Sequence, residues 1–218
     1  MTHAFLVFDL DGTLIDGYAA IADALSFAME RLGVPPLPLE KVRRMVGHGL
    51  EKLLEEAVGS GRAAEGVRLF RQRYSEVAIE ETELMPDVAE VLATLSRRGH
   101  AMAVASNKPA VFSRRILEAR GVASFFLAIG GPDAETPAKP DPAMLRRLME
   151  IAGAGPEQTI VIGDMEVDSE FARAAGCRVV LVPGGSRSRE ELEKVDSDAL
   201  LGEMKDLPAW LETNSPTG

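Results

Sequence analysis

The sequence predicts an α/β fold, a doubly wound parallel sheet with a small α-helical cap domain inserted after the first strand. Three observations lead to this prediction. Short uncharged apolar runs recur along the chain, helical patterns separate the later runs, and residues 17–82 show helical patterns alone. Because strands that alternate with helices form βαβ units, the sheet is expected to be parallel.

The first apolar run, Phe5–Phe8, predicts a strand that is buried on both faces. It leads directly into two carboxylates, Asp9 and Asp11, which Gly12 and Thr13 follow. A buried strand that ends in this way presents its acids at an edge of the sheet. Taken alone, the pattern also fits an ordinary strand followed by an Asx-type turn.

The insert that follows predicts four helices with no strand between them, at residues 18–32, 39–46, 50–58 and 63–79. We expect this segment, residues 17–82, to cover the ligand crevice as a cap, while residues 1–16 and 83–218 form the core. The alternative is a helical hairpin that packs beside the core and has no functional role. The cap is favoured because the insert begins only a few residues after the two carboxylates.

The chain alternates regularly after the insert. Further strands are predicted at residues 101–105, 125–129, 159–162 and 178–182. Helices are predicted at residues 86–98, 110–119, 142–151 and 166–174. The last part of the chain predicts a solvated turn and helix at 186–198, a short helix at 207–211 and a frayed tail at 214–218.

Three of the later strands are followed by polar groups of the kinds that bind phosphate or a hard metal ion. Ser106 and Asn107 follow the second strand, Lys139 comes after the third and an acidic loop, and Asp164 and Asp168 follow the fourth. Parallel α/β sheets place their ligand crevice at the carboxyl ends of the strands. These groups are therefore expected to converge although they lie far apart in the sequence.

The convergent groups suit phosphoryl transfer. One aspartate of a pair can attack phosphorus while the other serves as proton donor. Mg²⁺ prefers oxygen ligands, and Asp164 could supply an additional carboxylate ligand. Lys139 could neutralise the phosphoryl oxygens. The Ser106 hydroxyl could hold another oxygen, and Pro109 stands where a helix begins, so that the positive end of this helix would face the phosphate.

Four ordered motifs resemble those of the haloacid dehalogenase-like phosphohydrolases, from Phe5 to about Val182. They are Asp9-x-Asp11-Gly-Thr-Leu, Ser106-Asn, Lys139-Pro and Gly163-Asp164-x-x-x-Asp168. The resemblance implies a Rossmann-like core, the helical cap, Asp9 as nucleophile and Asp11 as general acid/base. It also implies phosphoryl binding by Ser106, Asn107 and Lys139. Mg²⁺ would be held by Asp9, the backbone carbonyl of Asp11 and Asp164, with Asp168 in support.

Within this family, residues 46–49, 106–109 and 172–177 look most like those of phosphoglycolate phosphatases. The resemblance therefore implies a Mg²⁺-dependent 2-phosphoglycolate phosphatase that works through an aspartyl phosphate. The alternatives are a phosphatase of another small sugar phosphate, a nucleotide or a pyrophosphate, a phosphomutase, and a non-catalytic binding protein of this fold. Dehalogenation is disfavoured because dehalogenases lack the second acid, Asp11. Met165 and Gly17 stand where these phosphatases usually carry hydroxyl residues.

The cap offers three candidates for substrate selectivity. His48 lies between two glycines that could direct it at the crevice, or it could simply mark a helix boundary. Arg43 and Arg44 could bind a second anionic group of the substrate, although a solvated helix face is the default for such residues. Lys108 could equally be a solvated residue or a second neighbour of the phosphate.

The bulk composition limits the partners. With 218 residues and a net charge of −10, the chain lacks the basic footprint that nucleic-acid binding requires. One cysteine excludes an intrachain disulfide, and the three scattered histidines argue against zinc. No signal peptide or membrane span is expected. These features predict a cytoplasmic monomer or homodimer whose partner is a small phosphorylated metabolite.

Overall fold

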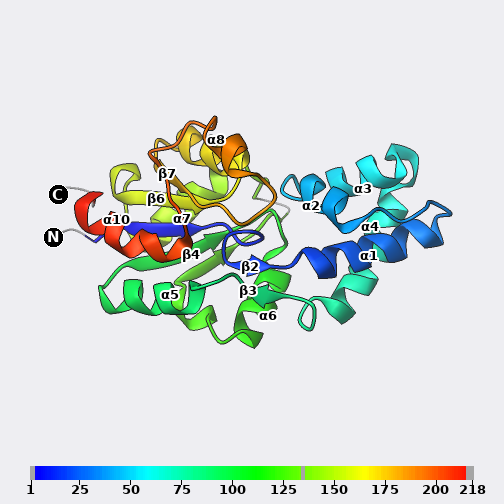
Figure 1. Ribbon diagram of the computed structural model, residues 1–218, viewed down its shortest axis with the longest axis horizontal. Helices are drawn as coiled ribbons and strands as arrows, with labels where there is room; N and C mark the ends of the chain where they lie inside the picture. Colours follow the sequence, from blue (N-terminus) through cyan, green and yellow to red (C-terminus); the bar gives the residue numbers. More distant parts are fainter. Residues whose placement is uncertain (1–2, 134–135, 215–218) are drawn as a thin grey trace.

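The computed structural model describes residues 3–133 and 136–214, and within them it contains a six-stranded parallel sheet (Figure 1). The strand order is β5-β4-β1-β6-β7-β8. The strands are β1 (Phe5–Phe8), β4 (Ala101–Ala105), β5 (Ala128–Gly130), β6 (Thr159–Gly163), β7 (Arg178–Leu181) and β8 (Ala199–Leu200). The predicted α/β fold with a parallel sheet is therefore confirmed.

Strand β1 lies at the centre of the sheet, and all four of its residues are buried. Phe8 is paired with Val104 of β4 and with Ile162 of β6. The residues that leave these three strands therefore emerge side by side at one edge of the sheet. The backbone N–H of Asp9 still donates to the Ile162 carbonyl at 2.8 Å, which fixes the first site residue to the sheet.

Helices cover both faces of the sheet because the side chains of β1 alternate between them. Phe5 and Val7 pack with α7 (Ala143–Ala152) and α8 (Glu166–Ala174), as the shared cluster with Leu145 and Phe171 shows. Leu6 and Phe8 face the other side, where the helices are α5 (Val88–Arg97), α6 (Ala110–Ala119) and α10 (Leu207–Asn214). Short helical turns complete the core, at η1 (Ala123–Phe125), η2 (Pro156–Gln158), α9 (Arg189–Leu192) and η3 (Met204–Asp206).

Four further helices pack on one another beside the sheet (Figure 1). They are α1 (Tyr18–Arg31), α2 (Leu39–Met45), α3 (Leu50–Val58) and α4 (Ser60–Val77). Positive φ angles at Gly47, Gly49 and Gly59 allow the sharp turns between α2, α3 and α4. The chain enters this bundle through β2 (Ile15–Asp16) and leaves it through β3 (Glu83–Leu84), and these two strands pair antiparallel.

Several predicted elements differ from the structure. The strand predicted at residues 125–129 is present as β5 but begins later, at Ala128, because η1 occupies the start of this segment and Leu127 is 56% exposed. Strands β2, β3 and β8 have two residues each, too few to show an apolar period. Helix α5 begins at Val88 rather than at residue 86, since Asp87 adopts a left-handed conformation with φ 63°.

Other boundaries moved by a few residues, as helix ends commonly do. Helix α4 begins at Ser60 instead of residue 63, and α9 occupies only part of the stretch 186–198. The frayed tail was predicted for 214–218; Asn214 ends α10, and the rest lies outside the described residues. Within 3–133 and 136–214, no helix combines the length and the hydropathy needed to cross a bilayer.

Candidate active site

Three carboxylates meet at the carboxyl ends of the central strands. Asp9 follows β1, Asp164 follows β6, and Asp168 lies in the first turn of α8. One oxygen from each of them lies within 4.8 Å of the other two, and all three residues are buried. The parallel register that aligns β1 with β6 brings together groups separated by about 160 positions in the sequence.

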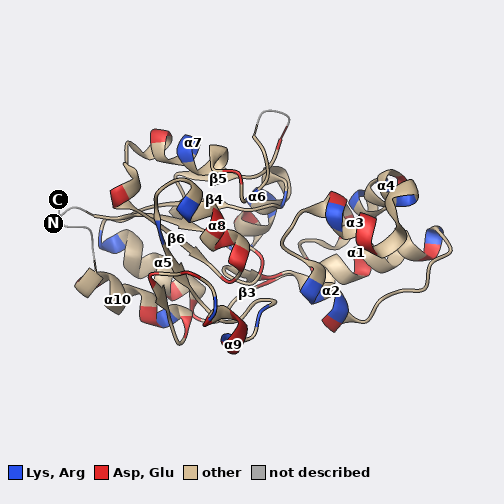
Figure 2. Cartoon of the chain, turned by 90° about the horizontal axis from the view of Figure 1, so that it is seen from above, with Lys and Arg blue, Asp and Glu red and all other residues tan. Residues whose placement is uncertain are grey.

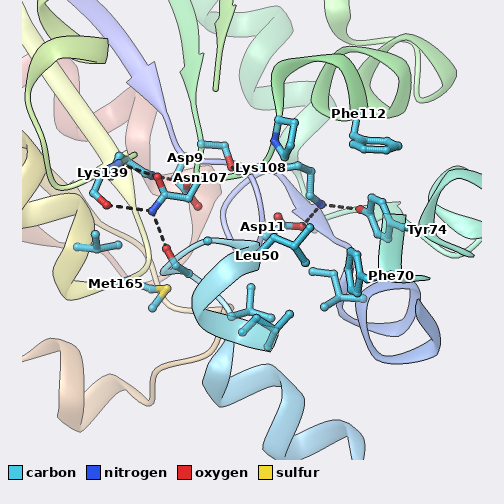
Figure 3. A pocket seen from close by; sticks show the side chains of 18 of the residues that line it. Asp9, Asp11, Leu50, Phe70, Tyr74, Asn107, Lys108, Phe112, Lys139 and Met165 are labelled. Carbon is cyan, nitrogen blue, oxygen red and sulfur yellow. Dashed lines mark hydrogen bonds and ion pairs between the residues drawn. The ribbon is translucent and has the colours of Figure 1, made fainter. Parts of the chain in front are cut away.

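Lys139 is the cation of this cluster, and its side chain is 2% exposed. Its Nζ donates to Asp9 Oδ1 at 2.5 Å and to Asp168 Oδ1 at 2.7 Å. Figure 3 shows Lys139 approaching Asp9 from the loop that precedes α7. This single ammonium group therefore bridges the proposed nucleophile and the acid of α8.

Burial sets the electrostatics of the cluster. It raises the pKa of Asp9 to about 7, with Lys139 opposing the shift and Asp168 adding to it. Burial and the neighbouring carboxylates also raise the pKa of Asp164 well above its usual range. Burial lowers the pKa of Lys139, but Asp168 and Asp9 outweigh it and leave this pKa above its ordinary value. The cluster therefore holds three acids, of which Lys139 pairs with only two, Asp9 and Asp168, and this imbalance favours an additional positive charge.

The donor set fits a hard divalent cation such as Mg²⁺, because all three groups offer carboxylate oxygens. Asp164 is held in place by Thr13, whose hydroxyl donates to Oδ1 at 3.0 Å, and by the N–H of Ser186, which donates to Oδ2 at 3.3 Å. Two glycines let the backbone approach this carboxylate. A Cβ at Gly12 would lie 2.6 Å from Asp164 Oδ2, and one at Gly185 would lie 1.7 Å away.

A buried hydroxyl beside the cluster supports the same fit. Tyr18 Oη has no hydrogen-bond partner among the described residues, and burial with the charges of Asp164 and Asp11 raises its pKa. A Cβ at Gly12 would lie 2.6 Å from Tyr18 Oη and 2.6 Å from Asp164 Oδ2, so both oxygens border the backbone at Gly12. Since Mg²⁺ keeps several of its waters when a protein binds it, this hydroxyl could bond to one of them.

Asp168 orients the cluster. Its Oδ2 accepts from the backbone N–H groups of Asp164 at 3.1 Å and Met165 at 3.2 Å, while Oδ1 faces Lys139. A Cβ at Gly163 would lie 2.3 Å from the Asp168 carboxylate, so glycine is required there. The carboxylate thus fixes both the loop that carries Asp164 and the Lys139 ammonium.

Asp11 lies on the other side of the site, where it pairs with Lys108. Lys108 Nζ is 2.8 Å from Asp11 Oδ1 and 2.7 Å from the Tyr74 hydroxyl on α4 (Figure 3). Burial lowers the pKa of Lys108, but Asp11 and Tyr74 outweigh it, so the net pKa is raised. Its side chain is 8% exposed, so the solvated alternative is wrong. No sequence signal indicated Tyr74.

Ser106 and Asn107 follow β4 and line the same cavity. The Ser106 hydroxyl accepts from the Lys108 N–H at 3.2 Å. The Asn107 amide group donates to the carbonyls of Gly47 at 2.9 Å and Lys139 at 3.1 Å, and its oxygen accepts from the Lys139 N–H at 2.7 Å. Asn107 therefore ties the Lys139 loop to the helical bundle, and its contact with phosphate stays a prediction.

The cavity between the sheet edge and the helical bundle measures about 760 Å³, including space open to solvent. Beyond the polar groups already described, its lining is largely apolar. The apolar residues of the bundle are Ile21, Val46, Leu50, Leu53, Phe70 and the ring of Tyr74, and those of the core are Pro109, Phe112, Met165 and Val167. Apart from Pro109, which was predicted to begin a helix facing the phosphate, none of these residues was identified as functional from the sequence.

The three predicted selectivity residues do not line this cavity. Arg43 donates to the Gly184 carbonyl at 3.2 Å, with its guanidinium 4.5 Å from the centre of the Tyr18 ring. Arg44 also lies on α2, whose lysine and arginine residues are blue in Figure 2, and it pairs with Glu191 at 3.0 Å. His48 is half-buried between the lining residues Gly47 and Gly49. The one arginine of the bundle in the lining is Arg71.

Comparison with known proteins agrees with this geometry. The sequence profile of the family described as haloacid dehalogenase-like hydrolase matches residues 6–182. The phosphoglycolate phosphatase of Pseudomonas putida is 33% identical over 211 residues, which cover 93% of this chain and 77% of the relative. The protein of the same name from Escherichia coli K12 is also 33% identical, over 93% of this chain and 90% of its own.

A solved structure shares the fold over almost the whole chain. The crystal structure of a predicted phosphoglycolate phosphatase from Haemophilus somnus superposes with a TM-score of 0.86 and 26% identity. The match covers 96% of this chain and 98% of the other. With the family match and the arrangement of Asp9, Asp164 and Lys139, these likenesses establish that the chain belongs to the haloacid dehalogenase-like hydrolases and is a phosphatase that resembles phosphoglycolate phosphatases.

Proposed function

We propose that the protein is a Mg²⁺-dependent phosphomonoester hydrolase that acts on a small metabolite through an aspartyl phosphate on Asp9. The observation that carries the proposal is the buried cluster of Asp9, Asp164 and Asp168, in which Lys139 pairs with Asp9 and Asp168. Such a cluster can bind a divalent cation and still place one carboxylate oxygen against a phosphorus atom.

The residues would divide the work as follows. When bound, Mg²⁺ would be held by Asp9, Asp164 and the backbone carbonyl of Asp11, where it would offset the charge of the phosphoryl group. Lys139 would neutralise a phosphoryl oxygen, since its Nζ lies 2.5 Å from Asp9 Oδ1. Ser106 and the N-terminus of α6, which begins after Pro109, would hold the remaining oxygens.

The reaction would proceed in two displacements. A carboxylate oxygen of Asp9 forms a bond to phosphorus while the bond to the ester oxygen breaks, and Asp11 gives that oxygen a proton. Asp11 then takes a proton from water, whose oxygen attacks the aspartyl phosphate, releases inorganic phosphate and restores Asp9. The second step requires Asp11 to lie near the same phosphorus, and its position two residues after Asp9 suits this role.

The helical bundle, residues 17–82, would act as the cap that closes over this reaction, with residues 1–16 and 83–218 as the core. Contacts between the two parts support this division. Asn107 bonds to Gly47, and Lys108 bonds to Tyr74, so that core residues of the site hold the bundle directly. A closed cap would limit the access of bulk water to the aspartyl phosphate.

The names of the relatives make 2-phosphoglycolate the first ester to test, as the sequence also predicts. The assay measures phosphate release from a panel of small phosphomonoesters, with Mg²⁺ and with excess chelator. We expect release to require the metal and to fall at least about a thousandfold in Asp9→Asn. A cytoplasmic location and a monomeric or homodimeric state stay predictions.

A matched control makes this test specific. Asp23→Asn changes another aspartate to its amide on α1, away from the cavity, where Asp23 pairs with Arg73. It should keep the wild-type rate. Full turnover in a folded Asp9→Asn protein, or release that the chelator leaves unchanged, would contradict the proposal. An isomerised product without free phosphate would indicate a phosphomutase instead.

A further inference from the structure

The two ends of the cavity differ in chemistry, and this difference bears on the substrate. One end holds Asp9, Lys139 and Asp168. The other end is lined by apolar side chains of α1, α3, α4 and α6, namely Ile21, Leu50, Leu53, Phe70, Tyr74 and Phe112. A phosphomonoester has a matching division between its charged phosphoryl group and its leaving group.

The proposed reaction fixes which part of the ester enters which end, so the inference rests on that proposal. The phosphoryl group must lie at Asp9 and Lys139, and the ester oxygen must reach the proton donor Asp11. In Figure 3, Lys139 lies on one side of Asp9, whereas Leu50, Phe70 and Tyr74 lie on the side of Asp11. The leaving group therefore extends into the apolar end.

Three aromatic rings line that end. Phe70 and Tyr74 are stacked with their ring centroids 5.3 Å apart, and Phe112 meets Tyr74 edge-on at 5.2 Å. Phe70 and Tyr74 are buried, while Phe112 and Leu50 are half-buried and keep surface available for contact. Such a surface binds apolar groups by removing them from water and binds rings by edge-on or stacked contact.

At the apolar end, the lining offers few favourable partners for a carboxylate of the substrate. Of its cations, Lys139 already faces Asp9 and Asp168, and Lys108 already bonds to Asp11 and Tyr74. Arg71 has a side chain that is 52% exposed and lies 3.5 Å from Glu51, so it belongs to the rim of the cavity. A carboxylate placed among the rings would lose its hydration without gaining a partner.

We propose that the site prefers substrates whose leaving group is apolar and contains a ring. A small hydroxy acid such as glycolate fits this site less well as the leaving group. The class of substrate is therefore a phosphomonoester of an alcohol with a ring-containing apolar body. This substrate is selected by the apolar wall, not by a cationic residue of the cap. The apolar wall is formed by Ile21, Leu50, Leu53, Phe70, Tyr74 and Phe112.

The first test compares benzyl phosphate with 2-phosphoglycolate as substrates of the wild-type protein with Mg²⁺. Both are primary esters in which one CH₂ joins the oxygen to a ring or to a carboxylate, so the pair differs chiefly in the group under test. We expect kcat/KM for benzyl phosphate to be at least about tenfold higher, because specificity is a ratio of kcat/KM values. A kcat/KM for 2-phosphoglycolate that equals or exceeds it would overturn the inference.

A variant pair localises the effect to the wall. Leu50→Arg places a cation at the first residue of α3, in the lining, and should change the ratio of the two kcat/KM values at least about tenfold toward 2-phosphoglycolate. Leu39→Arg makes the same change at the first residue of α2, where Leu39 is 44% exposed and outside the lining. It should leave the ratio unchanged. Equal ratios in Leu50→Arg and wild type would overturn the inference.

Binding of non-hydrolysable analogues separates this inference from the proposed function. Calorimetry with Mg²⁺ would compare 2-phenylethylphosphonate with 3-phosphonopropionate, in which CH₂ replaces the ester oxygen. We expect the phenyl compound to bind at least about tenfold more tightly. If no ester were hydrolysed but this order held, the apolar site would stand and the proposed function would fail. The reverse order of affinity would overturn the inference, whatever the protein hydrolyses.

Discussion

The two ends of the cavity are built by different means. At the charged end, Asp9 follows β1, Asp168 lies in the first turn of α8 and Lys139 comes from the loop before α7. These three side chains are locked by hydrogen bonds of 2.5–3.2 Å. At the apolar end, Leu50 and Phe70 come from helices and are positioned by packing alone. Bond geometry tolerates little change, whereas packed apolar surfaces accept many combinations of similar volume. Substitutions at the charged end are therefore expected to be tolerated less well than substitutions at the apolar end.

The largest effect is expected at the charged end, from Lys139→Met. This change leaves two buried carboxylates without their shared cation, and breaking a buried ion pair in this way costs about 3–5 kcal/mol of unfolding free energy. Turnover should fall with it. Urea unfolding provides the measurement. Lys205→Met, which breaks the exposed pair with Glu203, should leave the midpoint unchanged, and equal midpoints for both variants would contradict the argument.

The next effect concerns the close approach of the backbone to Asp164. In Gly185→Ala the new Cβ would lie 1.7 Å from Asp164 Oδ2, so either the loop or the carboxylate must move. We expect Mg²⁺ affinity and kcat/KM to fall at least about tenfold, in the range for disturbed ligand orientation. Gly61→Ala, at a helical glycine with nothing within 4 Å of its Cβ position, is the control and should preserve both quantities. Unchanged Mg²⁺ affinity in Gly185→Ala would refute this expectation.

A smaller effect is expected where the two ends meet. Tyr74 contributes its ring to the apolar wall and its hydroxyl to Lys108, which pairs with Asp11. A double-mutant cycle of Tyr74→Phe and Lys108→Met should give a coupling energy of about 1 kcal/mol in kcat/KM. Additive effects would mean that the apolar wall and the proposed general acid act independently.

The smallest effect is expected outside both ends of the cavity, and it concerns how the free energy of unfolding depends on pH. His100 Nδ1 lies 3.0 Å from the Ala4 carbonyl, and burial lowers its pKa. The neutral form is therefore favoured by folding, and this contribution is present above the unfolded pKa of about 6.5 and lost as pH falls through the folded value. Unfolding free energy measured from pH 7.5 to 5 should fall less steeply in His100→Gln. Identical slopes would count against this account.

The sequence was sufficient to predict which side chains meet where chemically reactive residues follow the predicted strands. Asp9, Asp164 and Lys139 follow apolar runs, and the rule that parallel strands end at one edge was enough to bring them together. The aromatic wall could not be found in this way, because Phe70 and Tyr74 have the helical spacing of any core residue. Periodicity identifies a buried face but not whether protein or substrate covers it.

The candidates for selectivity illustrate the same limit. Arg43 and Arg44 lie on the expected helix, but whether they face the cavity depends on how α2 sits against the core. That orientation follows from long-range contacts, such as those of Arg43 with Gly184 and of Arg44 with Glu191. The strands β2 and β3 were missed for a related reason, since two-residue strands are defined by their partner and not by their own pattern.

The pairing of β2 with β3 bears on how such a protein can diversify. Because Asp16 lies opposite Glu83, the two ends of the segment 17–82 leave the core side by side. A segment of any length whose ends meet in this way can be lengthened, shortened or exchanged without displacing Asp9 from β1. The architecture therefore allows the residues proposed for the reaction to be kept while the segment proposed to set the substrate changes. Asp16 and Glu83 mark the positions between which a segment from a relative could be transplanted.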